Sequence, residues 1–330
     1  MIAVSYHDTV NVLQGTNAPS PFERADWFAL LAESGTAPFV ARADDGEHCA
    51  ALALTRVAGR SGGRLEPLRN WYSFTWRALA PEGPHGARLL AALARDLRRQ
   101  THRLTLWPVP DEDGSATRLE RALREAGWSV AREQCDHNHV LGVNGRSFAE
   151  YWAARPGRMR TTLKRKANRV AVTISERFDA ADWAAYEAIY AESWKPEEGD
   201  PLLLRRFAEA EGAAGRIRLA VARADGEPVA AQFWTVEGGT AYIHKLAHLE
   251  ARKELSAGTT LTAALFEHTI DRDRVALIDF GTGDDAYKAD WMELVRPRYR
   301  LDCLDSRQPR AWPALAKRAL RRLAPSPAHG

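Results

Sequence analysis

Residues 240–292 read TAYIHKLAHLEARKELSAGTTLTAALFEHTIDRDRVALIDFGTGDDAYKADWM. The apolar-rich run at 242–247 has the length of a strand, and a small hydroxyl-bearing turn follows at 255–260. From 258 to 270 the apolar residues recur at helical spacing, which predicts an amphipathic helix. A second buried strand is predicted at 275–280, where glycines end it, and a further helix begins at the acidic pair after them. The order is strand, loop, helix, strand, helix.

The turn at Ser256–Thr260 is a candidate anion site. A helix that begins at a glycine directly after a strand offers amides without partners inside the helix, and its dipole favours negative charge. We therefore expect a phosphate group to dock there. The alternative is an ordinary connection that happens to contain a glycine, because a single S-x-G-T is a weak motif.

Three pieces of this stretch carry a resemblance to a known family. They are KLA-x8-S-x-G-T-x-L at 245–261, D-F-G-x-G-D at 279–284 and Y-K-x-x-W at 287–291, with earlier echoes at 70–73, 158–166 and 193–195. The chain resembles the GNAT acetyltransferase superfamily, and more narrowly the FemAB-like, cellulose-biosynthesis-associated acetyltransferases of bacteria. The resemblance implies an α/β (α+β) fold of two tandem GNAT-like domains, each a mixed, mostly antiparallel sheet flanked by helices.

Composition is that of an ordinary soluble protein. Of 330 residues, 45% are hydrophobic and 27% charged, with a formal net charge of +3, which is too mild to indicate nucleic-acid binding by itself. Three widely spaced cysteines argue against a disulfide framework and a zinc site, so no metal is expected. The first residues lack a secretory pattern and no apolar run is long enough to cross a membrane, so we expect a cytoplasmic protein. The oligomeric state is left open.

Two domains are expected from length and pattern. Residues 1–145 read as one α/β unit with a hairpin across 38–57, and we expect it to shape the substrate cleft. A linker rich in glycine and asparagine is expected at 142–146. Residues 146–324 are expected to bind the acyl-CoA, and 325–330 to form a loose tail.

The most basic stretch, 158–169, has three interpretations. On a helix it forms a solvated charged face, a patch for an acidic partner such as the phosphates of coenzyme A, or a surface for tRNA. No aromatic residue interrupts the run, which weakens the case for single-stranded RNA.

The resemblance assigns a cofactor site and a proton donor. It implies that acetyl-CoA or another acyl-CoA lies along the strand at 242–247, where the backbone of Leu246 and Ala247 polarises the thioester. The diphosphate is then expected on Ser256, Gly258, Thr259 and Thr260. Tyr287 takes the place of the tyrosine that protonates the leaving thiolate. Alternatively, Tyr287 is an aromatic residue packed against Trp291.

The general base and the acceptor contacts are candidates only. His244 has a suitable ordinary pKa, although a strand histidine can equally be structural. Asp279 orients an amine or caps the turn at Gly281. The residues expected to contact the acceptor are Tyr72, Trp194, Lys195, Lys245, Asp284, Lys288 and Trp291. Relatives often have proline where this chain has Ala257 and aspartate where it has Leu249, which puts one acceptor-side contact in doubt.

The resemblance, together with the predicted anion site, implies an acyl-CoA-dependent N-acyltransferase. The expected reaction is acetyl transfer to a primary amine of a small molecule, sugar or peptide, by direct attack in a ternary complex. Two alternatives stay open: a Fem-type transferase that uses aminoacyl-tRNA, and a non-catalytic protein that binds acyl-CoA.

Overall fold

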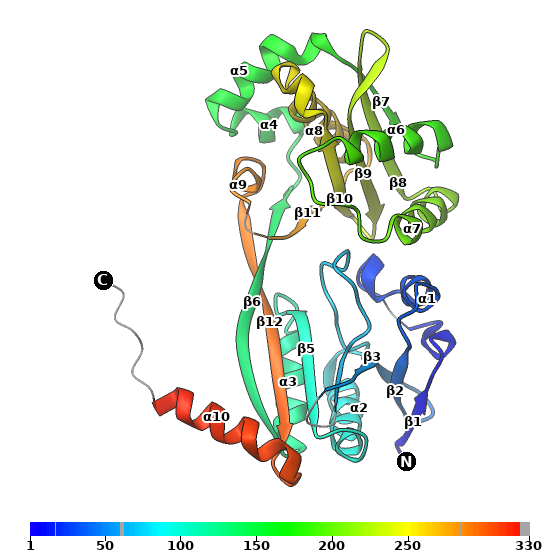
Figure 1. Ribbon diagram of the computed structural model, residues 1–330, viewed down its shortest axis with the longest axis vertical. Coiled ribbons are helices and arrows are strands. Elements are labelled where there is room, and N and C mark those ends of the chain that lie inside the picture. Colours follow the sequence, from blue (N-terminus) through cyan, green and yellow to red (C-terminus); the bar gives the residue numbers. More distant parts are fainter. Residues whose placement is uncertain (17, 60–62, 284, 324–330) are drawn as a thin grey trace. The chain divides into compact units, whose positions relative to one another are not determined.

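The computed structural model describes residues 1–16, 18–59, 63–283 and 285–323, and the chain forms two compact units. Unit 1 comprises residues 1–136 and 297–330, and unit 2 comprises residues 137–296. Both are mixed α/β structures with mostly antiparallel strands and flanking helices, so the expected fold class is confirmed (Figure 1). The boundary differs from the expected one, because residues from 297 onward return to unit 1. The expected tail lies outside the described residues.

Unit 1 is built on strands in the order β1, β2, β3, β4, β5, β12, with the first part of β6 beside β12. Its helices α2 and α3 pack on each other, and α2 packs on β2 and β3. The predicted hairpin is confirmed, since β2 pairs with β3 from Phe39↔Leu54 to Asp44↔Cys49. The bounds are β1 Ala3–His7, α1 Ala25–Glu33, β2 Phe39–Asp44, β3 Cys49–Val57, β4 Arg64–Pro67, α2 Gly83–Asp96, β5 Arg103–Pro110, α3 Ser115–Glu125, β12 Leu294–Asp305 and α10 Trp312–Leu323.

β6 runs without a break over Trp128–Gly142, whereas the sequence predicts two separate strands at 128–131 and 137–141. The expected linker is a tight turn at the end of this strand, where Asn144 and Gly145 have φ of 54° and 74°.

Unit 2 orders its strands as the end of β6, then β11, β10, β9, β8 and β7. Most pairs are antiparallel, but β10 and β11 are parallel. The bounds are α4 Phe148–Ala153, α5 Gly157–Lys166, β7 Ala171–Ser175, α6 Ala180–Ala191, α7 Pro201–Ala213, β8 Ile217–Ala224, β9 Glu227–Glu237, β10 Thr240–His248, α8 Ala257–Glu267, β11 Leu277–Thr282 and α9 Lys288–Trp291. The strand–helix–strand order predicted at 242–280 is confirmed.

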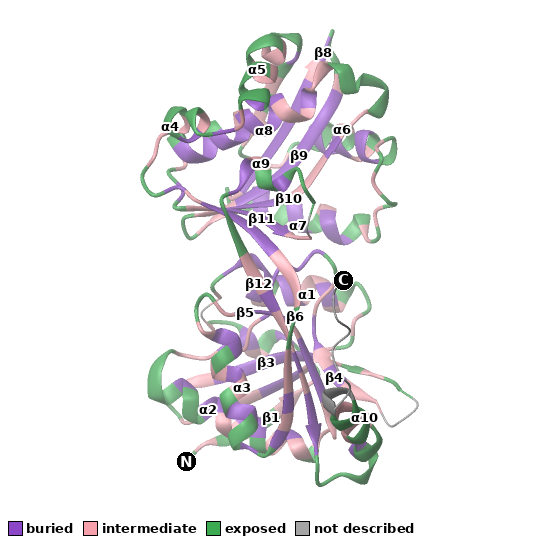
Figure 2. Ribbon diagram, turned by 90° about the vertical axis from the view of Figure 1, so that its left-hand side faces the viewer, coloured by how far each residue is buried: buried purple, intermediate pink, exposed green. Residues whose placement is uncertain are grey.

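Two adjacent residues of β9 define the two faces of this sheet. Neighbouring side chains of a strand point to opposite faces. The ring of Phe233 meets Trp183 of α6 at 5.4 Å and Phe207 of α7 at 5.8 Å, whereas Trp234 meets Phe266 of α8 at 5.5 Å. Helices α6 and α7 therefore cover one face and α8 the other, and the strands between them are buried (Figure 2).

Candidate functional site

The site in unit 2 begins where two neighbouring strands part. β10 and β11 pair at three positions, and their register ends at Tyr242↔Asp279. β10 stays paired with β9 as far as His248↔Ala230. The edge of β10 that faces β11 therefore leaves the parallel ladder after Tyr242. Backbone groups at such an edge are available to an extended ligand.

A β-bulge in β10 sorts its side chains between the two faces. The register with β9 passes from Ile243↔Trp234 to Lys245↔Phe233, so His244 is the extra residue. The His244 ring stacks on Phe233 at 5.0 Å, and its Nε2 lies 2.8 Å from Thr235 Oγ1. His244 thus belongs to the face covered by α6 and α7.

A pocket of about 410 Å³ lies on the α8 side of the sheet. It is lined by Met159, Trp194, Leu246, His248, Lys253, Ser256, Ala257, Gly258, Thr259, Thr262, Tyr287, Asp290 and Trp291. These residues come from α5, the end of β10, the start of α8, α9, and the segments that precede α8 and α9 or follow α6, all within unit 2. Its size is that of a small-molecule site.

The start of α8 supplies hydrogen-bond donors to this pocket. Ser256 precedes the helix in the left-handed conformation (φ 54°, ψ 35°), and its side chain does not cap the helix. The Thr260 amide donates to Ser256 O at 3.1 Å. The amides of 257–259 precede that first bond and are the ones that a helix leaves without internal partners. This end of α8 favours an anion by its donors and its dipole.

Gly258 keeps this corner open. A Cβ at this position would lie 3.4 Å from His248 Nδ1, which is tight, so a larger side chain would fill the pocket. Its carbonyl accepts a hydrogen bond of 2.8 Å from Thr262 Oγ1. Thr260 points elsewhere: it does not line the pocket, and its Oγ1 is buried without a hydrogen-bond partner among the described residues.

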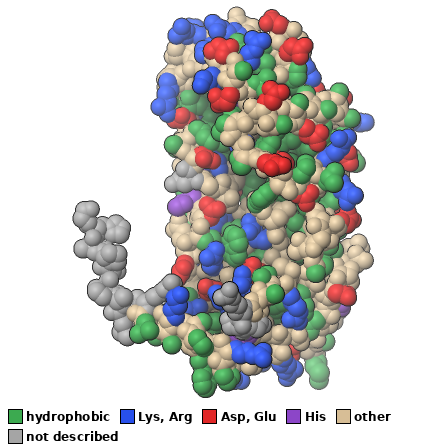
Figure 3. Space-filling model, in the orientation of Figure 1, with side chains coloured by type: hydrophobic (Ala, Val, Ile, Leu, Met, Phe, Trp, Pro, Cys, Tyr) green, Lys and Arg blue, Asp and Glu red, His purple; other side chains and the backbone are tan. Residues whose placement is uncertain are grey.

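Basic residues flank the start of α8. Lys166, at the end of α5, donates a hydrogen bond of 3.0 Å to Ser256 Oγ. Lys253 lines the pocket directly. Lysine and arginine side chains gather over the α5 end of unit 2 (Figure 3). The basic stretch at 158–169, for which a patch for an acidic partner is one of three interpretations, therefore contacts the predicted phosphate loop through Lys166.

Residues of α9 close another side of the pocket. Burial, and secondarily the charge of Asp285, raise the pKa of the Tyr287 hydroxyl, which therefore stays protonated at neutral pH. Lys288 is buried and its Nζ donates to Thr282 O at 2.5 Å, so it supports the turn after β11. The Trp291 ring packs at 5.0 Å from Phe266. Tyr287 and Trp291 line the pocket, whereas Lys288 does not.

Trp194 and His248 form an aromatic wall. Their ring centroids lie 4.3 Å apart, and Lys195 Nζ lies 5.4 Å from the Trp194 ring. Burial is the main cause that lowers the pKa of His248, and the charge of Lys195 lowers it further. Burial also lowers the pKa of Lys195.

A second pocket of about 420 Å³ lies beside α6 and α7. Its lining includes Tyr186, Tyr190, Lys195, Glu197 and Glu198. Glu198 accepts a hydrogen bond of 2.7 Å from Lys245 Nζ. Burial lowers the pKa of Lys245, and its bond to Glu198 opposes that shift.

Asp279 stabilises the point where the strands part. The residue is 6% exposed, and its carboxylate accepts hydrogen bonds from Asn138 Nδ2 at 2.8 Å and from the Gly281 amide at 2.8 Å. Asp279 therefore caps the turn at Gly281, which is one of its two predicted roles. A role for Asp279 in orienting an amine stays a prediction.

The structure brings together some of the predicted site residues. Leu246, Ser256, Gly258, Thr259, Trp194, Tyr287 and Trp291 share one pocket, and Lys195 lines the other. Ala247 is buried beside the first pocket without lining it. Tyr72 lies in unit 1, where its amide bonds to Asn70. Asp284 lies outside the described residues.

Several residues of the site are not predicted from the sequence. Lys253 lies close to the predicted turn and could have been found from its charge. Met159, Asn138 and Glu198 reach the site from distant parts of the chain, and no local pattern identifies them.

One group in unit 1 bears on the expectation of no metal. Ligand-forming atoms of Asp45, His48 and His85 lie within 4.8 Å of one another. Asp45 Oδ1 already accepts from the amides of Glu47 and His48, and His85 Nδ1 lies 2.9 Å from an Arg88 nitrogen. Asp45 thus stabilises the hairpin turn.

Comparison with known families agrees with the geometry of unit 2. Residues 157–289 match the family model described as acetyltransferase (GNAT) domain. This range contains the whole lining of the pocket beside α6 and α7, and all of the lining of the α8-side pocket except Asp290 and Trp291. Unit 2 therefore carries a GNAT acetyltransferase domain. No curated protein matches the chain significantly.

Solved structures place this GNAT domain in a FemAB-like fold. FemX aligns at 11% identity and a TM-score of 0.64, over 90% of this chain and 96% of that one. A protein described as L-PGS from Bacillus licheniformis aligns at 14% identity and a TM-score of 0.52, over 93% of this chain and 98% of that one. A tandem GNAT protein from the clavulanic acid biosynthesis pathway aligns at 14% identity and a TM-score of 0.50, over 91% of this chain and 98% of that one. Identities this low show the fold alone. No helix within the described residues has the length and apolarity needed to cross a membrane.

Proposed function

We propose that this protein transfers an acyl group, with acetyl as the first to be tested, from coenzyme A to a primary amine in a ternary complex. The observation that carries the proposal is the pocket at the parted strands, bounded by the open start of α8. The diphosphate of the cofactor accepts hydrogen bonds from the backbone amides of 257–259 and lies beside Lys166 and Lys253. The pantetheine arm runs along the edge of β10 beyond Tyr242, where the pairing with β11 has ended.

The chemistry needs few groups. The amine nitrogen attacks the thioester carbon, the C–S bond breaks and the amine gives up a proton. Backbone amides of β10 near Leu246 stabilise the oxyanion. Tyr287 then delivers its proton to the leaving thiolate, and its raised pKa keeps that proton available across neutral pH. His244 remains the candidate base, although its packing against Phe233 also gives it a structural role.

The acceptor occupies the pocket beside α6 and α7. Glu198 supplies a carboxylate for an ammonium group, and the rings of Tyr186 and Tyr190 supply apolar walls. Lys245 holds the Glu198 carboxylate in place. An amine with an apolar body fits this lining.

A direct test is acetyl-CoA binding by calorimetry. Wild-type protein is expected to bind saturably, and Gly258→Arg to abolish binding by filling the corner near His248. Ala210→Arg adds the same side chain at an exposed position of α7 and serves as the matched control. Equal affinities for acetyl-CoA in all three proteins would show that the diphosphate does not bind at the start of α8. A screen of amines for CoA release then tests transfer, and binding without turnover on any amine would favour a sensor.

One observation favours a second candidate, an aminoacyl-tRNA donor. Helix α5 exposes Arg158, Arg160, Lys164 and Arg165 beside the start of α8. Such a surface suits a phosphate backbone and predicts strongly salt-dependent binding. Charged tRNA that binds more tightly than acetyl-CoA, with a steep loss of affinity on added salt, would favour this donor.

A further inference from the structure

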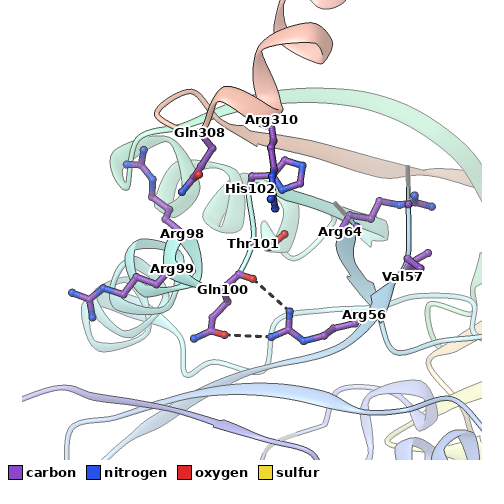
Figure 4. A pocket seen from close by; sticks show the side chains of 13 residues that line it. Arg56, Val57, Arg64, Arg98, Arg99, Gln100, Thr101, His102, Gln308 and Arg310 are labelled. Carbon is purple, nitrogen blue, oxygen red and sulfur yellow. Dashed lines mark hydrogen bonds between the residues drawn. The ribbon is translucent and has the colours of Figure 1, made fainter. Parts of the chain in front are cut away.

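Unit 1 contains a strongly basic pocket that the proposed acyl transfer does not use. Its volume is about 640 Å³, and its walls come from the end of β3, the start of β4, the segment 98–102 and residues 308 and 310 (Figure 4). The charged or titratable lining residues are Arg56, Arg64, Arg98, Arg99, His102 and Arg310. Within the described part of the chain, no carboxylate is among the lining residues.

Three of these arginines already have acidic partners outside the pocket. Arg98 pairs with Asp305, Arg99 with Asp96 at 2.9 Å, and Arg64 with Glu66. Arg98 also donates to Ala126 O at 2.7 Å, which fixes it in the wall.

Two arginines that line the pocket, Arg56 and Arg310, form no direct ion pair with a carboxylate among the described residues. Neutral groups hold Arg56, which donates to Gln100 Oε1 at 3.3 Å and lies 4.1 Å above the Phe39 ring. These contacts orient the guanidinium without neutralising it. A guanidinium so placed is suited to an oxyanion.

The lowered pKa of His102 reflects, in part, the same local excess of positive charge. Its ring lies beside Arg310 in the pocket (Figure 4). Burial is the main cause that lowers its pKa, and Arg310 and Arg103 lower it further, although Asp305 opposes them. An anion in the pocket would reverse the effect of the arginines, so binding would be coupled to proton uptake by His102.

We propose that this pocket binds a small phosphorylated molecule. Arg56 and Arg310 would contact the phosphate oxygens, with His102 and the side-chain amide of Gln308 as further donors. The cavity falls within the usual range of roughly 300–1,000 Å³ for small-molecule sites, which leaves room for an organic part beyond the phosphate. The proposal does not depend on acyl transfer, because all of its residues belong to unit 1.

Calorimetry with inorganic pyrophosphate on the full chain, in phosphate-free buffer, tests this site. The double variant Arg56→Gln/Arg310→Gln is expected to lose at least about tenfold in affinity, the scale of one lost charge-assisted contact. The control variant Arg95→Gln/Arg121→Gln removes two exposed helix arginines and is expected to bind as wild type does. Thermal melts check that each variant is folded.

Two further measurements separate this site from the one in unit 2. Gly258→Arg is expected to leave pyrophosphate binding at this pocket intact. The pKa of His102, followed by NMR, is expected to rise when pyrophosphate is added, so that affinity increases as pH falls through the His102 titration. Absence of binding, equal affinity in the double variant, or a loss confined to Gly258→Arg would each overturn the proposal. Binding of heparin without binding of pyrophosphate would overturn it too, in favour of an extended polyanion.

Discussion

Lys166 Nζ lies 3.0 Å from Ser256 Oγ, and this hydrogen bond joins the last turn of α5 to the residue that precedes α8. The two residues are 90 positions apart in the chain. Their contact brings a positive charge to the helix end whose amides are open to an anion. The basic character of α5 and the glycine turn before α8 thus contribute to one electrostatic environment.

We expect Lys166→Met to weaken acetyl-CoA binding by about five- to tenfold, because a charge-assisted contact to phosphate is worth roughly 1–1.5 kcal/mol at a partly exposed position. The loss should shrink as salt is added. Calorimetry at two salt concentrations measures both effects. Lys164→Met, which removes an exposed lysine of the same helix, is the control. Similar losses in both variants would indicate a diffuse effect of charge.

Tyr287→Phe is expected to lower kcat by about 10²-fold, the lower part of the range for general acid catalysis, and to leave acetyl-CoA affinity near normal. Burial raises the pKa of Tyr287, so its deprotonation should not limit the rate near neutral pH. Steady-state kinetics and calorimetry on the same variant separate the two quantities. Tyr299→Phe in unit 1 is the control. An unchanged kcat would remove Tyr287 from the mechanism.

His248 should titrate below its ordinary pKa of 6.5, because burial opposes its charged form. The unfolded chain then binds more protons than the folded one below about pH 6.5, so folded stability falls as pH decreases through that range. Trp194→Ala removes the ring 4.3 Å away and should raise the pKa of His248 toward 6.5. NMR titration of the imidazole checks this. A His248 pKa that Trp194→Ala leaves unchanged would show that the Trp194 ring does not bury it.

The elements of unit 2 could be predicted because their signals are local. The apolar spacing at 258–270 and the glycine turn before it identify a helix and its start without reference to the rest of the chain. The orientation of His244 could not be predicted, since a one-residue bulge places it on the same face as Lys245. Nor could the pairing of Asn138 with Asp279, which are 141 positions apart.

Asp279→Ala is expected to destabilise the protein by about 2–3 kcal/mol, because it leaves the buried Asn138 amide and the Gly281 amide without their acceptor. Chemical denaturation measures the change, and Asp285→Ala, at an exposed position, is the control. A double-mutant cycle with Asn138→Ala should show coupling between the two side chains. Normal stability with reduced turnover would instead favour the role of Asp279 in orienting an amine.

Glu198→Gln is expected to raise the KM for the amine by about tenfold while the KM for acetyl-CoA stays near its wild-type value. The carboxylate of Glu198 faces the pocket beside α6 and α7 and is held by Lys245, so its loss removes the negative charge that attracts an ammonium group. It also leaves the partly buried Lys245 with a weaker partner, which should lower the pKa of Lys245 further. Glu197→Gln changes a neighbouring residue of the same lining and is the matched control. Equal effects of the two substitutions on the KM for the amine would mean that the pocket attracts cations only through its overall charge. If neither substitution changes this KM, the acceptor does not bind in this pocket.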